Sequence, residues 1–348
     1  MADQTIQLRI RDIIVEKHDV KTFVFERVDG GELVYKAGQF LTFLISLYGH
    51  EIRRSYSMSS APDVDLFPAI TVKRVANGEV SRYWLDHVQV GDIFNSLEPA
   101  GRFVLHEEDR GNRDIILIGA GSGITPLFSI LKQVSNNDED SFVTLIYANR
   151  NDRHTLFHDQ IAEMETRFAS RLRVIHIHSQ PSEDWPGIRG RINNTRLEQL
   201  VNKNLHFLPA QARFFICGPY DLMRSVEITL HYMGFGKDQI RKENFVIEKL
   251  PPPPPVSYSH TIHLTFRGEE RELLVPAHTT ILDAAIQSGI NIPYSCKGGR
   301  CATCAAVHTH GALHMSFNEV LTDRDLAQGW ILTCSAYVDG DDVRIEVR

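Results

Sequence analysis

Four cysteines near the carboxyl end constrain this chain more than any other feature of its sequence. Cys296, Cys301 and Cys304 follow the spacing C-x4-C-x2-C, and Cys334 comes 30 residues later. This spacing is typical of plant-type 2Fe–2S clusters, in which one loop supplies three thiolates and a neighbouring segment supplies the fourth. The glycines at 298–299 allow the loop backbone to turn its N–H groups toward sulfide. The sequence therefore predicts an iron–sulfur site with these four ligands.

A structural zinc site with four cysteine ligands is the alternative for the same residues. Zinc sites usually have two closely spaced pairs of cysteines with a longer gap between the pairs. Three cysteines in one loop and a distant fourth do not follow that pattern. The spacing therefore favours iron–sulfur over zinc.

Length and composition limit the class of protein. A chain of 348 residues is long for one core, so two or three domains are expected. A net charge of −7 and a pI near 6.1 argue against nucleic acid as the main partner. The charged first 20 residues do not fit a signal peptide, and no apolar run is long enough to span a bilayer. Five cysteines, four of them in one motif, fit the reducing cytoplasm, which is the expected location.

Residues 1–109 predict a β-rich domain. Residues 6–10 and 21–26 each alternate apolar and polar side chains, as half-buried strands do. Many short strands separated by turn residues are typical of an antiparallel barrel or sandwich.

A group of side chains within residues 53–58, R-R-S-Y-S-M, could bind a flavin. In an extended segment, Arg54 and Tyr56 project to one face and Ser57 to the other. A guanidinium suits phosphate, an aromatic ring packs on a flat ring, and a hydroxyl can bond a ring nitrogen. Such a short motif is common in strands, so its interpretation depends on the segment that follows.

Residues 71–84 supply that second signal. Residues 71–74 read as a strand, Asn77-Gly78 as a tight turn, and Ser81 as the cap of a helix that begins there. A helix N-terminus attracts phosphate. For Ser81, an ordinary N-cap with no ligand is the alternative.

From residue 110 the pattern becomes that of a parallel α/β domain. Residues 115–118 form a continuous apolar run, typical of a strand buried on both faces. They lead into G-A-G-S-G-I-T-P at residues 119–126, and a helix is expected over 127–134. A strand, a glycine-rich turn and a helix N-terminus form a phosphate cradle, so residues 110–249 are predicted to bind a dinucleotide.

The second strand of this domain, expected over 142–148, ends beside residues that bear on the choice of coenzyme. NAD sites often have an acid at this point for the ribose 2′-OH, whereas an arginine suits a 2′-phosphate. Arg150 and Arg153 favour NADPH, but Asp152 lies between them. The sequence leans slightly toward NADPH and leaves NADH open.

Two further strands carry residues with more than one interpretation. His176 and His178 share one face of a strand expected over 171–179, but no third metal ligand is evident and packing is favoured. Residues 214–219, F-F-I-C-G-P, read as a buried strand and a sharp turn. Cys217 then lies at the carboxyl end of a strand, where ligands of open α/β sheets bind. A small buried hydrophobe is its alternative role.

A run of five prolines separates the last part of the chain. Residues 250–256, L-P-P-P-P-P-V, favour an extended polyproline II spacer. Residues 257–348 then read as a hairpin, a helix over 280–288 capped by Thr279 or Thr280, the cysteine loop and a final strand.

These motifs, in this order, resemble the three-domain flavin and iron–sulfur reductases that supply electrons to bacterial oxygenases. The end of the chain looks like a plant-type ferredoxin, and the rest is similar to a ferredoxin–NADP reductase. The subgroup with the ferredoxin at the C-terminus includes the reductases of phenylacetyl-CoA epoxidase and 3-ketosteroid 9α-hydroxylase. The resemblance implies an FAD-binding antiparallel β-barrel (1–109), an NAD(P)-binding α/β domain with a parallel sheet (110–249) and an α+β, β-grasp 2Fe–2S domain (257–348).

The resemblance also implies roles for individual residues. Arg54 and the helix start at Ser81 would hold the FAD pyrophosphate. Tyr56 would pack on the isoalloxazine, and Ser57 would bond near its central ring nitrogen. Cys217 would lie beside the nicotinamide and would be catalytic together with Tyr56 and Ser57. The other expected cofactor contacts are Val72, Lys73, Gly78, Val80, Gly119, Gly121, Ser122, Gly123, Thr125, Arg150, Arg153, Gly218, Pro219 and Phe245.

Three redox sites in one chain predict an electron-transfer enzyme. Nicotinamide gives up two electrons together and a 2Fe–2S cluster accepts one, so a flavin is needed between them. The expected function is to pass electrons from NAD(P)H through FAD to the cluster and on to an oxygenase or other acceptor protein. The alternatives are a general ferredoxin or quinone diaphorase without a dedicated partner, and a non-enzymatic redox-sensing or zinc-stapled protein. The sequence sets no oligomeric state.

Overall fold

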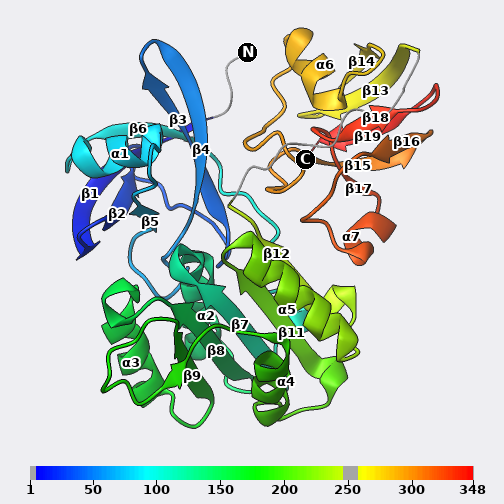
Figure 1. Ribbon diagram of the computed structural model, residues 1–348. Helices are drawn as coiled ribbons and strands as arrows, with labels where there is room; N and C mark the ends of the chain where they lie inside the picture. The colour runs from blue at the N-terminus through cyan, green and yellow to red at the C-terminus, as the bar shows by residue number, and fades with distance from the viewer. Residues whose placement is uncertain (1–4, 246–257, 348) are drawn as a thin grey trace.

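The computed structural model describes residues 5–245 and 258–347, which form three units built on sheets (Figure 1). The units follow one another along the chain and are coloured blue to cyan, green, and yellow to red. The proline run expected at 250–256 lies outside the described residues. Within them, no helix combines the length and the apolar character that crossing a membrane requires.

The first unit is a six-stranded antiparallel barrel. Its elements are β1 (Thr5–Lys17), β2 (Val20–Arg27), β3 (Phe40–Leu47), β4 (His50–Ser57), β5 (Ala69–Lys73), α1 (Glu79–Asp86), β6 (Ile93–Leu97) and a 3₁₀ turn (Glu107–Asp109). The strand order is β4-β3-β6-β1-β2-β5, and every pair is antiparallel. An isolated bridge between Met58, just after β4, and Ile70 of β5 joins the two edges. The expected barrel is confirmed.

An aromatic cluster fills the barrel around Trp84 of α1. The Trp84 ring centroid lies 4.9 Å from that of Phe23, 5.0 Å from Phe43 and 4.6 Å from Phe94. Each of these side chains is buried, and large rings contribute much of the apolar area that a small core can remove from water. This packing fixes α1 beside β5, so the first turn of α1 has a defined position.

The helix start expected at Ser81 is corrected by the structure. The helix begins at Glu79 with Gly78 as its N-cap. The Ser81 hydroxyl accepts a hydrogen bond from the Val75 N–H (3.1 Å) and donates one to the Gly78 carbonyl (3.2 Å). Ser81 therefore lies inside the first helical turn and stabilises the turn that precedes the helix. Gly78 occupies the N-cap position.

The second unit is a six-stranded parallel sheet with helices on both faces. Its strands are β7 (Asp114–Ala120), β8 (Phe142–Asn149), β9 (Leu172–His178), β10 (Ile188–Arg189), β11 (Ala212–Cys217) and β12 (Ile240–Glu243). Its helices are α2 (Ile124–Asn137), α3 (His158–Arg167), α4 (Asn194–Lys203) and α5 (Tyr220–Tyr232), with 3₁₀ turns at Gly121–Gly123, Asp152–His154, Pro209–Gln211 and Lys237–Gln239. The strand order is β10-β9-β8-β7-β11-β12, as expected of a dinucleotide-binding domain.

The helix α2 begins three residues earlier than the sequence suggests. Gly123 is its N-cap, and Pro126 occupies the third helical position. A proline is tolerated in the first turn because that N–H has no partner within the helix. The N-terminus of α2 therefore points out of the glycine-rich loop, at the carboxyl end of β7.

The barrel and the parallel sheet share one apolar core. Val20, Ala37 and Phe103 of the first unit belong to the cluster that covers one face of the sheet. The Phe103 and Phe215 ring centroids are 5.4 Å apart, with the planes at 84°. The two units are therefore packed as one body.

The third unit is a mixed sheet crossed by a helix. Its elements are β13 (His260–Phe266), β14 (Glu269–Val275), α6 (Ile281–Gln287), β15 (Ala305–His310), β16 (Leu313–Met315), α7 (Asp323–Ala327), β17 (Trp330–Leu332), β18 (Ala336–Val338) and β19 (Arg344–Val347). Its main sheet has the order β14-β13-β19-β15-β17, and β13 and β19 run parallel. The Thr280 hydroxyl accepts from the Asp283 N–H (3.1 Å) and caps α6. This arrangement agrees with the expected β-grasp.

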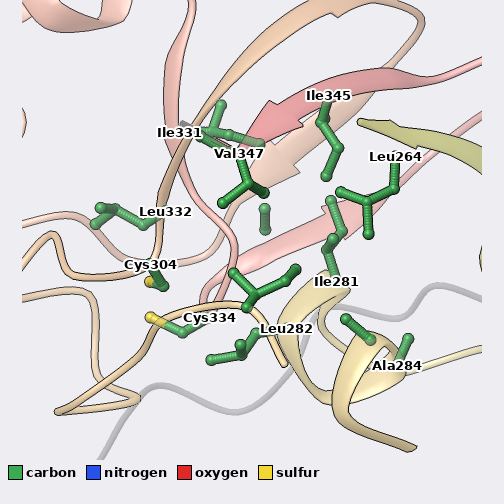
Figure 2. Close-up of a cluster of buried hydrophobic side chains, with 14 of the residues drawn as sticks. Leu264, Ile281, Leu282, Ala284, Cys304, Ile331, Leu332, Cys334, Ile345 and Val347 are labelled. Atoms are coloured by element: carbon green, nitrogen blue, oxygen red, sulfur yellow. The ribbon is translucent and has the colours of Figure 1, made fainter. Parts of the chain in front are cut away.

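The core of the third unit contains only residues from that unit. Leu264, Ile281 and Ile345 are among its fully buried members. Figure 2 shows Cys304 and Cys334 at one edge of this core, with their sulfur atoms turned toward one another. The distant fourth cysteine therefore does meet the loop of the other three.

Candidate electron-transfer site

A cavity of about 700 Å³ lies where β4, β5 and α1 meet the glycine-rich loop. We call it the barrel cavity. Ten of the residues expected to contact a cofactor line it: Arg54, Tyr56, Ser57, Lys73, Gly78, Val80, Ser81, Ser122, Thr125 and Phe245. The two motifs at residues 53–58 and 71–84, which the resemblance assigns to one flavin site, therefore line one cavity.

Tyr56 presents a neutral, half-buried ring to this cavity. Its ring centroid lies 5.9 Å from that of Trp84, so the barrel core holds the ring in place. Burial raises the pKa of the Tyr56 hydroxyl above its usual value, and the charge of Arg54 opposes this shift. The exposed guanidinium of Arg54 donates to the Arg53 carbonyl (2.8 Å). A flat ring and a cation at one rim suit a flavin with a phosphate tail.

Ser57 meets a carboxyl group that sequence reasoning missed. Its hydroxyl donates to Glu243 Oε2 at 2.6 Å, and both side chains are buried. Burial raises the pKa of Glu243 to about 7, although the Ser57 hydrogen bond acts in the opposite direction. The pair can therefore hold or release a proton near neutral pH at the floor of the site. Its members are 186 positions apart, and no local pattern links them.

Val72 departs from the expected cofactor contacts. Its side chain is fully buried in the barrel core and does not line the barrel cavity, whereas its neighbours Thr71 and Lys73 do. Alternate residues of a strand point to opposite faces, so only one of Val72 and Lys73 could reach the cavity.

A second cavity of about 760 Å³ lies at the carboxyl edge of the parallel sheet. We call it the sheet-edge cavity. Of the expected residues, Lys73, Gly121, Arg150 and Pro219 line it. Lys73 lines both this cavity and the barrel cavity. The two cavities therefore adjoin at the glycine-rich loop.

Close backbone contacts shape that loop. A Cβ atom on Gly123 would lie 2.2 Å from the Cys217 carbonyl oxygen, so only glycine fits. The buried Tyr147 hydroxyl donates to the Gly121 carbonyl (3.1 Å) and accepts from the Leu156 N–H (3.2 Å). The absence of a side chain at Gly123 therefore allows α2 to pack closely on β11. Tyr147, which belongs to no recognisable sequence motif, holds the loop in place.

The charged residues after β8 do not all face the sheet-edge cavity. Arg150 lines it together with His154 and Arg191. Arg153 is exposed, and the structure does not bring this expected residue to the cavity lining. The Asp152 carboxylate lies 3.2 Å from Nδ1 of the buried His178. The cavity is therefore lined by the guanidinium groups of Arg150 and Arg191 and by the carboxylates of Asp19 and Asp221. Arg191 comes from the segment between β10 and α4, which has no recognisable motif.

Cys217 is part of the apolar core. Its side chain has no exposed area, and burial raises the pKa of the thiol well above its usual value, with the Glu243 carboxylate adding to the shift. Neither Cys217 nor Gly119 nor Gly218 lines the sheet-edge cavity. A Cβ on Gly119 would meet Leu127 at 2.6 Å. The environment favours a neutral thiol, so a reactive thiolate at this position is not supported.

His176 and His178 pack as side chains of the sheet. The His178 ring stacks on Trp185 at 4.0 Å, and burial lowers the pKa of both histidines, to about 4 for His176. Among residues 5–245 and 258–347, no third ligand joins them in a metal-binding group. The packing interpretation agrees with this geometry.

The cysteine loop brings four thiols together. Hydrogen bonds from the Cys301 and Cys334 thiols lower the pKa of Cys296 and raise the pKa of both donors, which shows that these thiols are in contact. The Gly298 N–H donates to Cys296 Sγ and the Gly299 N–H to Cys334 Sγ, both at 3.3 Å. Thiolate is the ligand form of cysteine, and backbone donors to sulfur are typical of iron–sulfur loops. The residues present therefore fit the cluster that the spacing predicts.

A third cavity of about 140 Å³ separates the cysteine loop from the barrel cavity. We call it the junction cavity. Its lining from the first two units includes Ser57, Glu243 and Phe245, and from the loop it includes Cys296 and Cys301. Phe245 also lines the barrel cavity and is 46% exposed. The candidate cofactor sites thus follow one another without an intervening layer of packed core.

Side chains bridge the loop to the second unit beside this cavity. The Glu319 carboxylate accepts from Arg300 Nε (2.9 Å) and from Asn244 Nδ2 (3.0 Å). Arg300 is buried, and its guanidinium lies 4.8 Å from the Phe317 ring centroid. Phe245 lines the barrel cavity, and Asn244 reaches Arg300 of the cysteine loop through Glu319. The segment after β12 therefore contacts both.

Three family descriptions match successive parts of this chain. Residues 7–105 match the oxidoreductase FAD-binding domain, residues 117–227 the oxidoreductase NAD-binding domain, and residues 264–339 the 2Fe-2S iron-sulfur cluster binding domain. Phthalate dioxygenase reductase has the same fold, with a TM-score of 0.60 at 23% identity over 99% of this chain and 98% of its own. FAD, NAD(P)H and a 2Fe–2S cluster are therefore the cofactors of these three units.

Curated relatives match over nearly the full length. The ferredoxin reductase component of 3-ketosteroid-9-alpha-monooxygenase from Mycobacterium tuberculosis is 31% identical over 99% of this chain and 96% of its own. A component of 1,2-phenylacetyl-CoA epoxidase from Escherichia coli K12 is 32% identical over 90% of this chain and 88% of its own. The chain is therefore an oxidoreductase and belongs to the family of three-domain ferredoxin reductases that carry FAD-binding, NAD-binding and C-terminal 2Fe–2S domains.

Proposed function

We propose that this chain takes electrons from NADPH and delivers them, through FAD and the 2Fe–2S cluster, to an oxygenase component. The adjacency of the three cavities supports this order most strongly. Lys73 is shared by the sheet-edge and barrel cavities, and Phe245 by the barrel and junction cavities. The flavin, when bound, accepts two electrons together and releases them singly.

The lining residues support specific roles in this reaction. Arg54 and the N-terminal turn of α1 hold the FAD phosphates, because a cation and free helical N–H groups favour anions. Tyr56 packs on the flavin ring as a neutral side chain. Ser57 and Glu243 hold a proton at the floor of the flavin site. Cys217 packs behind Gly123 of the glycine-rich loop and stays a neutral thiol.

The glycine-rich loop holds the coenzyme phosphates. Gly121 lines the sheet-edge cavity, and Ser122 and Thr125 line the barrel side of the same loop. The Thr125 hydroxyl donates to the Ser122 carbonyl (2.8 Å) and stabilises the turn at the start of α2. Helical N–H groups and the helix dipole at this point favour a pyrophosphate.

The charges in the sheet-edge cavity support NADPH as the donor. Arg150, His154 and Arg191 line the cavity where the ribose of the adenosine half would bind. Asp152, the acid that could hold a free 2′-OH, lies beside His178 and does not line the cavity. The carboxylates of Asp19 and Asp221 line the same cavity, so the support for a 2′-phosphate comes from the guanidinium groups of Arg150 and Arg191.

The coenzyme preference is tested by steady-state rates with NADPH and with NADH. Removal of a charged hydrogen-bond partner costs about 1.5–3 kcal/mol, which is roughly 10- to 150-fold. Arg150→Ala should lower kcat/KM for NADPH by that factor and leave NADH nearly unchanged. Arg153→Ala is the matched control and should affect neither. Equal losses with both coenzymes would contradict the assignment.

An oxygenase component is the proposed acceptor. The relatives are named as components of 3-ketosteroid-9-alpha-monooxygenase, 1,2-phenylacetyl-CoA epoxidase and glycine betaine monooxygenase. A cytoplasmic location and the boundaries 1–109, 110–249 and 257–348, with a spacer at 250–256, belong to the same proposal. The general diaphorase alternative predicts full turnover with quinones alone.

The whole proposal is tested by anaerobic titration of the purified holoprotein with NADPH. Flavin absorbance at its visible maximum and the broad cluster absorbance should both bleach, with the flavin leading. NADPH consumption should then be coupled to substrate oxygenation when a candidate oxygenase is added. A cluster that stays oxidised beside a fully reduced flavin would refute the electron path.

A further inference from the structure

The strand β4 has a second functional face. Arg54 and Tyr56 line the barrel cavity, whereas Arg53 turns toward the third unit. Its guanidinium carbon lies 4.1 Å from the Tyr294 ring centroid, and Nη1 donates to the Tyr294 carbonyl at 3.5 Å. The Arg53 side chain is 13% exposed. This contact joins the strand that binds the flavin to the segment that begins the cysteine loop.

The contact lies next to a cluster ligand. Tyr294 is followed by Ser295 and then by Cys296. The Ser295 hydroxyl lies 2.5 Å from the Ser55 hydroxyl, which in turn lies 2.8 Å from that of Thr42 on β3. The loop is therefore fixed to the barrel at two successive residues just before its first thiolate.

Several features favour arginine at position 53. The Glu51 carboxylate accepts from Arg53 Nε at 3.2 Å and orients the guanidinium. A planar guanidinium stacks on an aromatic face better than an ammonium does, and the attraction is greater when the pair is shielded from water. Arg53 lines the junction cavity but not the barrel cavity, so it does not belong to the flavin-binding residues.

We propose that Arg53, through its stack on Tyr294, is a positioning residue that seats the cluster loop for electron transfer from the flavin. This inference rests on the proposed electron path. It adds a residue that controls the rate of the last step within the chain, electron transfer from the flavin to the cluster. Electron transfer falls steeply with donor–acceptor distance. A loop released from β4 therefore receives electrons more slowly, while nucleotide-to-flavin transfer, which uses other residues, continues.

Stopped-flow absorbance of the full-length holoprotein with NADPH separates the two steps. In Arg53→Ala, cluster bleaching should slow by roughly tenfold, which corresponds to 1.4 kcal/mol, and flavin bleaching should stay within twofold. Tyr294→Leu should give the same pattern from the cluster side. Arg53→Lys should lie between the wild type and Arg53→Ala because it keeps the charge and loses the planar stack.

Arg11→Ala provides the matched control. Arg11 also lies 4.1 Å from an aromatic centroid, that of Phe67, but on the barrel away from the cysteine loop. It should leave both bleaching phases unchanged. If cluster bleaching slowed as much in Arg11→Ala as in Arg53→Ala, the effect would be general damage to the barrel, and the inference would fail.

Hydrogen–deuterium exchange gives a readout that does not depend on turnover. Amides of residues 294–301 should exchange faster in Arg53→Ala and in Tyr294→Leu, with β13 unchanged and the cluster spectrum intact. Unchanged exchange and unchanged cluster bleaching in both variants would overturn the inference. Failure of the proposed function is distinguishable, because then the wild-type cluster itself would not be reduced by NADPH.

Discussion

The barrel and the parallel sheet are packed as one body, whereas the ferredoxin domain meets them mainly through polar side chains. Phe103 and Phe215 lie in one shared apolar core. The contacts across the ferredoxin boundary include Arg53–Tyr294, Ser55–Ser295, Asn244–Glu319, Arg102–Asp325 and Lys237–Asp323. Packed cores hold one geometry, and polar interdomain contacts allow relative motion. The nucleotide-to-flavin step is thus built into a fixed body, and the flavin-to-cluster step depends on a contact that can open.

The strongest test of this separation is to remove the cluster alone. Cys334→Ser replaces the thiolate that comes from outside the loop, and we expect the iron bound per FAD to fall by more than about tenfold. Flavin bleaching by NADPH should remain because its residues lie in the other body. Iron and sulfide analysis with stopped-flow absorbance checks both. Cys217→Ser is the control for iron content and should retain the cluster.

A substitution in the shared core should greatly lower the stability of the barrel and the parallel sheet and leave that of the ferredoxin domain unchanged. Phe103→Ala removes a buried ring and should cost about 3–5 kcal/mol of unfolding free energy, because it opens a cavity between the barrel and the sheet. Urea unfolding followed by the fluorescence of Trp84 and Trp185 should report this loss, in a Trp330→Phe background because Trp330 lies in the ferredoxin domain. The midpoint followed by cluster absorbance should stay unchanged.

A matched variant in the ferredoxin core sharpens that result. Leu264 is fully buried among residues of its own domain, and Leu264→Ala should cost about 2–5 kcal/mol there. It should shift the cluster midpoint and leave the fluorescence midpoint in place. If both variants shift both midpoints equally, the three units unfold together and the comparison is wrong.

The fixed body should also show a pH dependence that the ferredoxin domain lacks. Burial raises the pKa of Glu243 from 4.5 to about 7, so the folded protein retains a proton that the unfolded chain loses over this range. The Glu243 contribution to stability therefore falls as pH rises from about 4.5 to 7, by up to about 3 kcal/mol, and is level above pH 7. The lowered pKa of His176 gives a contribution of opposite sign between about 4 and 6.5, so the two contributions must be separated by mutation.

Glu243→Gln should remove the Glu243 contribution while keeping an oxygen to accept from Ser57. Urea midpoints at several pH values should show an advantage for the variant that grows toward pH 7. Glu139→Gln, at an exposed carboxylate of the same unit, should keep the wild-type slope. A difference between variant and wild-type midpoints that is the same at every pH would mean that Glu243 does not titrate in this range.

The smallest expected effect lies in the cap of α6. The Thr280 hydroxyl accepts from the Asp283 N–H at 3.1 Å, and Thr280→Ala should cost about 1 kcal/mol. The loss should appear only in the cluster midpoint. Thr309→Ala, at an exposed strand residue, should change it by less than about 0.5 kcal/mol.

Features that depend on neighbouring residues were predictable from the sequence. The spacing of Cys296, Cys301 and Cys304 and the apolar run of β7 both arise within one short segment. The glycine-rich turn and the order of three domains follow similarly. The four cysteines meet in the structure, and the barrel motifs at 53–58 and 71–84 meet at one cavity.

Features that depend on distant residues were not predictable. Glu243 reaches Ser57 only after the sheet is assembled, and Arg191 reaches the sheet-edge cavity from a segment without a motif. The orientation of Val72 follows from the register of β5, which composition does not specify. The early start of α1 reflects a competing hydrogen bond from the Val75 N–H, in the turn before the helix, to Ser81.

The end of β12 and the residue that follows it carry a constraint on length. Glu243 faces the flavin side, and its neighbour Asn244 faces the ferredoxin domain. In extended backbone, loss or gain of one residue exchanges the two faces. The Asn244 amide would then face Ser57 in place of the titratable carboxyl, and the Glu243 carboxylate would face Glu319. Homologous chains should therefore vary in residue type along this segment far more readily than in the number of residues it contains.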